Sequence, residues 1–395
     1  MVDYNLAEIQ SAYGDSCARY EEKSSAKLAH SDTIIISGYG CSLSVKHDAL
    51  RIYPGRTHKD QQQDIVMLYR GVHNIKQIIL LSDKGEITLD AIRWSIEQGI
   101  AIMMIDGRGN LMQSLTPEYE SYAALRRSQY LAIDSGLHIE VGRHIVRRKL
   151  QEQIVTLKKR FSHKKARISQ AVSRVVIEDG IGITEVELQL AMLSQPIWYR
   201  VEKEIEELIL LNSLDAIRTL EARCGAVYWY AFLGIPIKWN SKDAKIVPPH
   251  WKVITKRESP LSTSSIGQRK GTGRRAINPY HAVTNYAYAV LQGQCKQSLI
   301  SQGFDTACGF LHSDMLHRDS LIFDVMDAGL RPKVDHLILK MFASTTLSKG
   351  DFMSSKTGEV IFNPQFSRFI AASCRIPQIE VDDTVSWLKG LLIGS

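Results

Sequence analysis

The chain has 395 residues, of which 44% are hydrophobic and 23% charged, with a formal net charge of +7. This length and hydrophobic content suffice for at least two domains with buried cores, and they exclude an intrinsically disordered chain. No apolar run approaches the roughly 20 residues of a membrane span, and the first residues do not resemble a secretory signal. We therefore expect a cytoplasmic protein that does not enter a membrane.

The six cysteines are scattered and form no C-x-x-C pair. This spacing argues against a zinc knuckle or a disulfide framework and favours a reducing compartment. A basic chain that concentrates its positive charge usually binds a polyanion, so the location of that charge matters.

Short β-branched runs punctuated by Gly, Asp and Asn predict strands at 33–37, 42–45, 50–53, 77–82 and 101–106. Lys46, His47 and Asp48 predict a hairpin turn between the second and third runs. Between the last two runs, Thr88 can cap a helix that closes at Gly99. These features predict a β-α-β unit.

After about Pro117 the periodicity is helical almost to the end of the chain. Within 200–234, apolar residues recur at three- and four-residue spacings and stop at Gly234. Prolines and a Ser/Gly-rich basic stretch interrupt the pattern at 236–277. Helical order resumes with Asn278 as N-cap, and it ends before Gly303.

The predicted fold class is therefore α+β, with a small β-rich N-terminal domain followed by a larger all-helical C-terminal domain. We expect a polar leader at 1–30, the β-rich domain at 31–117, the helical domain at 118–345 and a C-terminal helical tail at 346–395. A basic loop at 240–277 lies within the helical domain.

Glu221 is the first candidate site residue. It lies four residues after Ile217 and three before Cys224, so it shares the apolar stripe of its helix. A carboxylate in that position needs a cation, a metal ion or a full set of donors. The structural alternative is a Glu at the edge of the stripe that pairs with a basic residue.

The second candidate is the stretch GFLHSDMLHRDSLIFDVMDAGLRP, residues 309–332. Ser320 can cap a helix that runs to about Gly329, which places Asp324 and Asp327 near one face. One alternative is a solvated ion pair between Asp327 and Arg331. The apolar residues around the acids instead predict a partly buried face.

His312 follows the apolar stretch CGFL, which should hold it close to the core, where a lone His is more often a satisfied core residue than a ligand. A His together with carboxylates from separate segments is a mixed nitrogen and oxygen set. Such a set suits Mg²⁺ or Mn²⁺ better than a structural zinc site.

Positive charge is concentrated in two stretches, 143–174 and 252–275, and the first contains a single acid, Glu152. A solvated helix face is the alternative, but so one-sided an excess favours phosphate binding. The nearby Tyr280, Tyr286 and Tyr288 could stack on bases, although core packing is favoured. The predicted DNA-binding residues are Arg147, Arg148, Lys158, Lys159, Arg160, Lys164, Lys165, Lys256, Arg257, Arg269, Lys270, Arg274 and Arg275.

Three segments, LEARCGAVYWYAF, AINPYHAVTNYAYAVL and GFLHSDMLHRDSLIFDVMDAGLRPKVD, resemble the signature segments of the CRISPR adaptation integrase, the spacer-acquisition endonuclease. The resemblance covers about 32–345 and includes that family's N-terminal β-domain and helical catalytic domain. It implies that Glu221, His312 and Asp327 match the metal ligands and that Asp324 matches the neighbouring catalytic acid.

The function implied by the resemblance is a Mg²⁺- or Mn²⁺-dependent DNA endonuclease and integrase, which joins DNA 3′-hydroxyl ends to a target phosphodiester as in CRISPR spacer acquisition. The implied partners are double-stranded DNA, a second copy of the chain joined through the β-rich domain, and the small ferredoxin-like adaptation protein of that system.

Several alternatives stay open. The wording HWKVITKRESPL is similar to the stand-alone and casposase-like branch, which integrates transposon ends and can lack the small partner. A stand-alone DNA nuclease is a further reading. The intact Glu, His and Asp set argues against a non-catalytic DNA-binding relative, and the lack of an RNP-type aromatic motif or KH loop argues against an RNA-directed nuclease.

Overall fold

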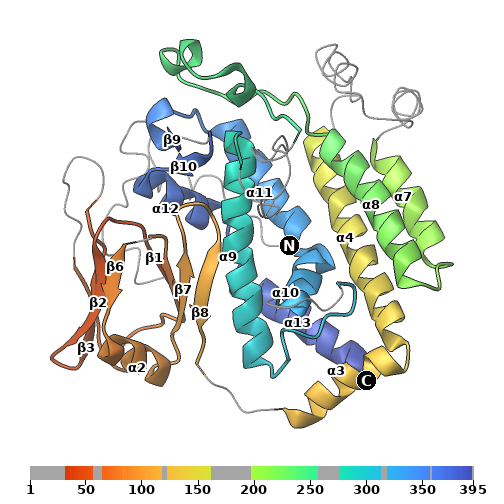
Figure 1. Cartoon of the computed structure of the whole chain (residues 1–395), viewed down its shortest axis with the longest axis horizontal. Coiled ribbons are helices and arrows are strands. Elements are labelled where there is room, and N and C mark those ends of the chain that lie inside the picture. Colours follow the sequence, from red (N-terminus) through yellow and green to blue (C-terminus); the bar gives the residue numbers. More distant parts are fainter. Residues whose placement is uncertain are drawn as a thin grey trace, which may run out of the picture. The chain divides into compact units, whose positions relative to one another are not determined.

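The computed structural model of the chain describes residues 32–56, 65–82, 84–117, 122–161, 197–256, 276–312, 318–355 and 358–393 (Figure 1). The chain forms two compact units. The first comprises Met1–Glu120, Glu258–Ser301 and Ser348–Arg375, and the second comprises Ser121–Arg257, Gln302–Leu347 and Ile376–Ser395. This division interleaves the sequence, whereas the predicted domains were consecutive blocks.

The first unit contains a four-stranded sheet in the order β1-β5-β7-β8. β5 is parallel to both β1 and β7, and β8 is antiparallel to β7. The strands are β1 (Thr33–Ile36), β5 (Gln77–Leu80), β7 (Ala101–Ile105) and β8 (Leu111–Leu115). Helix α2 (Leu89–Glu97) precedes β7, and the Thr88 hydroxyl caps it by accepting from the Ala91 N–H at 3.2 Å. The predicted β-α-β unit is confirmed.

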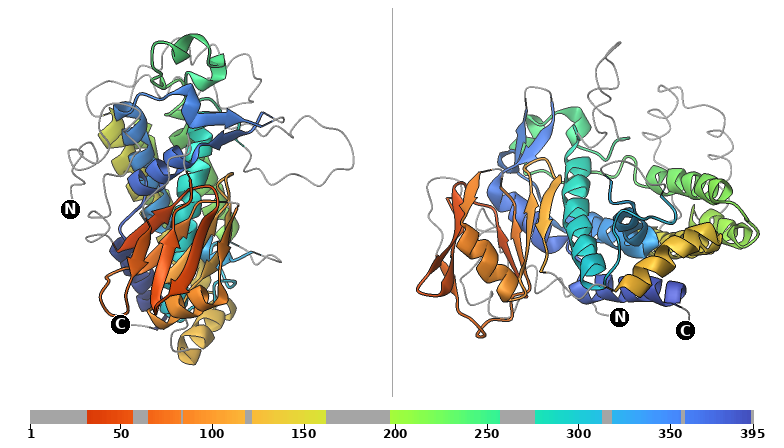
Figure 2. Two further views of the ribbon diagram at one scale, coloured as in Figure 1. Left: turned by 90° about the vertical axis from the view of Figure 1, so that its left-hand side faces the viewer. Right: turned by 60° about the horizontal axis from the view of Figure 1, so that its bottom comes forward.

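A second sheet in the first unit has the order β4-β3-β2-β6 (Figure 2). Its strands are β4 (Val66–Leu68), β3 (Ala49–Tyr53), β2 (Cys41–Lys46) and β6 (Gly85–Ile87). The predicted hairpin turn is confirmed, with His47 and Asp48 both at positive φ between β2 and β3. Trp94 of α2 is fully buried in the core shared by the two sheets, and its indole N–H donates to the Asp48 carbonyl at 3.0 Å.

Two later segments of the chain join the first unit because they pack on its first sheet. Helix α9 (Pro279–Ser301) packs against β7 and β8, and α12 (Pro364–Ser373) packs against β1. The Asn278 side chain accepts from the Tyr280 N–H at 2.9 Å, as the predicted cap requires. Tyr280 and Tyr286 are fully buried, so their predicted place in the core is confirmed.

Directly before α12 in the sequence is a short hairpin that the helical periodicity did not predict. It follows the 3-10 turn η7 (Lys349–Asp351) and consists of β9 (Phe352–Ser354) and β10 (Val360–Phe362). Phe352, Phe362 and Phe366 form an aromatic cluster under it, with ring centroids 5.0 to 5.8 Å apart. The predicted C-terminal helical tail is therefore a hairpin and two helices divided between the two units.

The second unit is helical in the described residues apart from isolated bridges. Its α-helices are α3 (Ala123–Asp134), α4 (Leu137–Phe161), α7 (Ile197–Leu208), α8 (Leu214–Tyr230), α10 (Ser320–Val325), α11 (Arg331–Ser344) and α13 (Gln378–Ile393). Two 3-10 turns, η4 (Asp243–Lys245) and η5 (Pro249–Trp251), lie in the segment after α8. Helix α4 packs against α7, α8 and α11 (Figure 2).

The helical pattern in 200–234 divides into α7 and α8. The break comes at Ser213, whose hydroxyl accepts from the Ala216 N–H at 3.3 Å and starts α8. One further boundary differs from the prediction, because Asp319, not Ser320, is the N-cap of α10. The predicted helix end near Gly329 is confirmed. Within the turn η6 (Met326–Leu330) the backbone leaves helical geometry at Ala328 and at Gly329, with φ of 99°, and α11 is a second helix that begins at Arg331.

The predicted α+β class is confirmed, since a strand-rich N-terminal region precedes a mostly helical remainder. Among the described helices, none is both long and apolar enough to cross a membrane.

Candidate active site

Two carboxylates from separate segments meet at one lysine in the second unit, and an imidazole lies beside one of them. The Lys149 ammonium, on α4, donates to Glu221 Oε1 of α8 and lies 3.2 Å from Asp327 Oδ1 of η6. On the other side of the same carboxylate, His312 Nε2 lies 3.8 Å from Asp327 Oδ2. The predicted residues Glu221, His312 and Asp327 are therefore brought together, and Lys149 joins them.

Asp324 lies directly behind this group and fixes the backbone that carries the histidine. Its Oδ2 accepts from the N–H groups of Phe310 and Leu311 at 2.6 and 3.0 Å, and its Oδ1 accepts from the His312 N–H at 3.0 Å. The His312 ring Nδ1 is 2.6 Å from the same Oδ1. The carboxylate is fully buried. Asp324 thus holds the histidine segment in place and does not itself face the group around Lys149.

This contact also decides which ring nitrogen of His312 faces the other acids. In the neutral ring, the nitrogen that binds a carboxylate carries the proton, and the other nitrogen keeps its lone pair. With Nδ1 donating to Asp324, the lone pair belongs to Nε2, which faces Asp327. A carboxylate behind a histidine is the arrangement that orients a metal-ligating imidazole.

The Asp327 side chain is 2% exposed, and one of its oxygens forms ion pairs with two cations. Arg331 Nη1 lies 2.6 Å from Oδ1, the same atom that Lys149 approaches. Burial alone would raise the pKa of Asp327, but Arg331 and Lys149 outweigh that effect and hold its pKa below the ordinary value. The i,i+4 pair with Arg331 exists, as one alternative predicted, but it is partly buried, with the Asp327 carboxylate almost wholly enclosed.

Lys149 was missed as a site residue because the sequence placed it in a run of basic residues. It lies three residues after the buried Val146 and four before the buried Gln153, so it shares the buried stripe of α4. This spacing is the signal that singled out Glu221. Burial alone would lower the pKa of Lys149, but Asp327 and Glu221 outweigh it and raise that pKa.

Glu221 is the most open of the three acids, with 25% of its side chain exposed. Its neighbours on the stripe, Leu220 and Cys224, are buried. Glu221 therefore lies at the edge of the apolar stripe and pairs with a lysine, as the alternative interpretation predicted. The same lysine also pairs with Asp327.

The donor set of Glu221, His312 and Asp327 is that of a divalent cation site, with two carboxylates and one imidazole lone pair. In the described part of the chain, no three His, Cys, Asp or Glu side chains are grouped so that they could hold a metal ion as they stand. The Lys149 ammonium already contacts both Glu221 and Asp327 as a bound cation. The residues fit a metal ion chemically once this ammonium moves.

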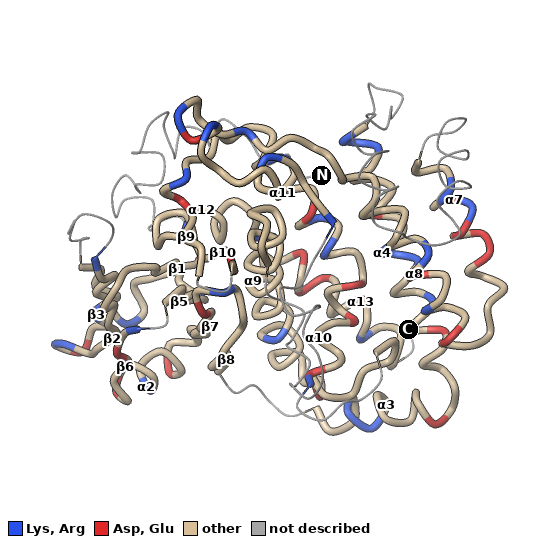
Figure 3. The backbone as a smooth tube through the Cα atoms, turned by 45° about the horizontal axis from the view of Figure 1, so that its top comes forward, with Lys and Arg blue, Asp and Glu red and all other residues tan. Residues whose placement is uncertain are grey.

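The predicted DNA-binding residues divide into three groups. Arg147, Lys159 and Arg160 are exposed on α4, and Lys256 is exposed at the end of its segment. Figure 3 shows the basic positions of α4 beside acidic positions on α7. Outside the described residues lie Lys164, Lys165, Arg257, Arg269, Lys270, Arg274 and Arg275.

Two of the predicted DNA-binding residues already make contacts within the second unit. The Arg148 guanidinium lies 4.3 Å from the centroid of the Trp387 ring of α13. Burial lowers the pKa of Arg148. Lys158 pairs with Glu202 of α7 at 2.5 Å. To bind a phosphate, Arg148 and Lys158 would first have to leave these partners. The exposed residues named above could bind a phosphate without leaving a buried contact.

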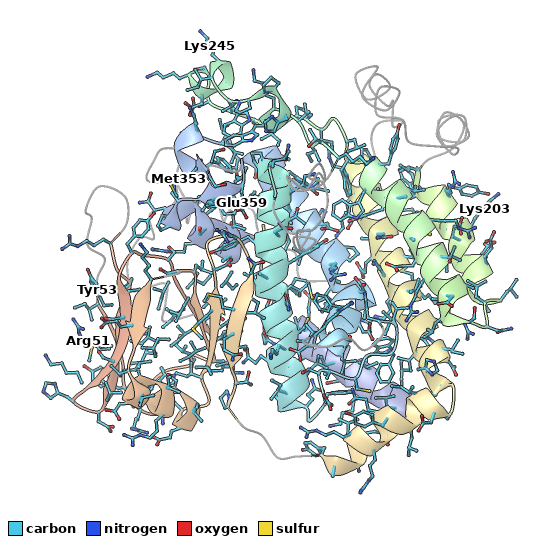
Figure 4. All side chains as sticks on the ribbon, in the orientation of Figure 1. Arg51, Tyr53, Lys203, Lys245, Met353 and Glu359 are labelled. Carbon is cyan, nitrogen blue, oxygen red and sulfur yellow. The ribbon has the colours of Figure 1, made fainter. Side chains whose placement is uncertain are left out.

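The segment 235–256 carries exposed lysines that the sequence analysis did not single out. The rings of Trp239 and Trp251 stack with centroids 6.0 Å apart and anchor the segment. The indole N–H of Trp239 donates to the Trp251 carbonyl at 3.0 Å. Lys242 and Lys245 are exposed on this support, and Figure 4 shows Lys245 projecting from it.

Comparisons with known proteins show which family the chain resembles. Residues 34–236 and 254–373 match the family model described as CRISPR associated protein Cas1. The CRISPR-associated protein Cas1 3 of Methanobrevibacter ruminantium is 25% identical over 323 residues, which cover 80% of each chain. The CRISPR-associated endonuclease Cas1 1 of Archaeoglobus fulgidus is 21% identical over 290 residues, 70% of this chain and 71% of that protein.

Among solved structures, a casposase bound to integration product has the same fold, with a TM-score of 0.66 and 18% identity over 91% of this chain and 90% of that one. The family match covers well over half of the sequence and includes the segments that carry Glu221, His312 and Asp327. The chain belongs to the Cas1 family.

Proposed function

We propose that this chain is a DNA endonuclease and integrase that depends on Mg²⁺ or Mn²⁺ and joins DNA 3′-hydroxyl ends to a target phosphodiester during CRISPR spacer acquisition. Membership of the Cas1 family supports the proposal, as do curated relatives that are named as endonucleases. The CRISPR-associated names of these relatives favour spacer acquisition over transposon integration.

The observation that carries the proposal is that Glu221 and Asp327 share the Lys149 ammonium while His312 Nε2 lies 3.8 Å from the other oxygen of Asp327. Two acids from separate segments need a cation to lie together at low exposure. The imidazole beside the same carboxylate completes a donor set that suits a divalent cation.

Glu221, His312 and Asp327 would hold the metal ion, which when bound neutralises charge on the phosphate and activates the attacking oxygen. The chain itself supplies the orientation. Asp324 fixes the His312 ring so that Nε2 faces Asp327, and Arg331 keeps the Asp327 carboxylate ionised and in place. Phosphoryl transfer relies mainly on such positioning and on charge neutralisation.

Double-stranded DNA is the proposed substrate. The exposed basic residues of α4 and of the segment 235–256 would contact its phosphates, which position a duplex without reading its sequence. Because joining must handle two DNA ends, we also propose a dimer formed through the strand-rich first unit. The small ferredoxin-like adaptation protein is the proposed second partner.

A plasmid assay with a short labelled duplex tests the proposal. With Mn²⁺ and free 3′-hydroxyl ends, we expect covalent joining of the labelled strand to the plasmid. A dideoxynucleotide at each 3′ end should remove the joined product, because the attacking oxygen is gone, while nicking by water persists. The Glu221→Gln variant should lose both reactions.

Three outcomes would contradict the proposal: joining that survives the dideoxy block, nicking without any joined product under every metal and end structure, or full activity in EDTA. The second outcome alone would leave an ordinary endonuclease.

A further inference from the structure

The position of Lys149 suggests a role that goes beyond the proposed metal site. Its ammonium touches carboxylates from two different helical segments, α8 and η6, and its side chain is 12% exposed. Two other lysines of the second unit each pair with one acid nearer the surface. Lys158, with Glu202, is 47% exposed and Lys333, with Glu380, is 37% exposed.

The surroundings of Lys149 hold its chain firmly in this position. Val146, Leu150 and Gln153, on the same face of α4, are buried, and α4 packs against both α8 and η6. Thr156, further along α4, donates to the Pro332 carbonyl at 2.9 Å and ties this helix to α11. The ammonium therefore enters the acid group from a rigid element.

Charge explains why an internal cation is needed. Arg331 binds Asp327 through Oδ1, but Glu221 has no contact with Arg331 in the described structure, and its ion pair is with Lys149. Without the Lys149 ammonium, Glu221 and Asp327 would face each other with one cation fewer, and like charges in a partly buried site repel.

We infer that Lys149 is a built-in counter-cation of the metal site: it holds Glu221 and Asp327 together before the metal ion binds, and the ion must displace its ammonium. The inference rests on the proposed function, because it assumes that these acids are metal ligands. Lysine suits the role because its charge sits on a flexible chain with three rotatable donors, so the ammonium can withdraw while the helix stays in place.

Two consequences follow. A neutral residue at this position removes the competitor and leaves the acids with more net negative charge, so Mn²⁺ should bind more tightly. The same change removes the cation that holds the acids together, so the metal-free protein should be less stable, and added metal should restore the stability.

The test compares wild type, Lys149→Met, Lys149→Gln and Lys149→Arg, with Lys333→Met as a control that removes a lysine paired with a single acid. Each EDTA-treated protein is titrated with Mn²⁺ by calorimetry, and its thermal unfolding is followed with and without Mn²⁺. We expect Lys149→Met and Lys149→Gln to bind Mn²⁺ at least about tenfold more tightly than wild type. Lys149→Arg and Lys333→Met should stay within a factor of about two.

In EDTA, Lys149→Met should unfold at a lower temperature than Lys333→Met, and Mn²⁺ should raise its unfolding temperature more than that of wild type. If Lys149→Met does not fold without metal, refolding in Mn²⁺ should recover it. Lys149→Gln keeps a hydrogen-bond donor. Its Mn²⁺ affinity then decides whether the Lys149 ammonium competes with the metal ion.

Unchanged or weaker Mn²⁺ binding by the neutral variants, while wild type binds Mn²⁺ and Glu221→Gln does not, would overturn the role of Lys149 and leave the metal site intact. If wild type and Glu221→Gln bind Mn²⁺ equally, or neither binds, the proposed metal site is overturned, and the counter-cation role falls with it.

Discussion

The carboxylate of Asp324 binds His312 twice, through the backbone N–H at 3.0 Å and through ring Nδ1 at 2.6 Å. The same carboxylate caps the N–H groups of Phe310 and Leu311. One buried acid thus fixes both the path of the chain and the direction of the imidazole. It is a positioning residue, whereas the resemblance matched it to a catalytic acid beside the metal ligands.

Asp324→Ala should therefore be among the most destabilising changes at the site. It leaves two buried N–H groups, of Phe310 and Leu311, and the partly buried N–H of His312 without an acceptor. Each unsatisfied buried group costs about 1–3 kcal/mol. We expect the free energy of unfolding to fall by about 3 kcal/mol or more, with loss of DNA cleavage. Denaturant unfolding in EDTA measures this, and Glu221→Gln serves as the control at the open edge of the same site. A denaturation midpoint equal to that of wild type would contradict the positioning role.

Removing a charge from the two proposed acidic ligands should have unequal effects on stability. Asp327→Asn leaves Arg331 and Lys149 in a buried site without their shared anion, and breaking a buried pair in this way costs about 3–5 kcal/mol. Glu221→Gln, at the partly exposed edge, should cost less than about 1 kcal/mol. Both variants should lose Mn²⁺-dependent cleavage. If denaturant unfolding shows equal losses of stability for the two variants, Asp327 does not contribute more than Glu221 to the stability of the buried cations.

Exposed basic residues of α4 should set the salt dependence of DNA binding. Each phosphate contact contributes about 0.9 to the slope of log affinity against log salt concentration. Replacing Arg147, Lys159 and Arg160 with Ala should lower that slope by about 2 to 3. Lys203→Ala, on the acid-rich helix α7, is the matched control and should leave the slope unchanged. Fluorescence anisotropy with a duplex at several salt concentrations gives the slopes. If the triple variant leaves the slope unchanged, these residues form a solvated helix face that does not contact DNA.

The thiol of Cys224 should be unreactive in the folded protein. Burial raises its pKa to about 12, and Glu204 adds to that effect. At pH 8 the thiolate, which is the reactive form, is then about one part in ten thousand, and solvent access is blocked as well. Iodoacetamide labelling followed by site-resolved mass spectrometry should show Cys224 modified only after unfolding in guanidinium. Rapid labelling of Cys224 under native conditions would contradict the burial of this face of α8.

Local pattern was enough to predict five strands of the first unit, the β2–β3 turn, the Thr88 and Asn278 caps and most of the helical remainder. The short strands β4 (Val66–Leu68) and β6 (Gly85–Ile87) were not predicted. It also identified Glu221, His312, Asp324 and Asp327 as candidates, because the quoted segments carry those residues in a specific order. These features depend on neighbours within a few positions, such as a capping hydroxyl three residues from its N–H or an acid on the apolar stripe of its own helix.

The sequence did not predict which of these residues would touch, because those contacts join segments far apart along the chain. Lys149 and Glu221 are separated by 72 positions, and no local spacing could pair them. The hairpin at 352–362 was missed for the same reason, since its strands are short and gain their stability from the Phe366 cluster and from α9. Sequence alone determined which side chains are the candidates for the chemistry. The packing of α4 against α8 and η6 decided which of them touch, because only tertiary contact can bury a carboxylate, bring a lysine to it and place a ring nitrogen beside it.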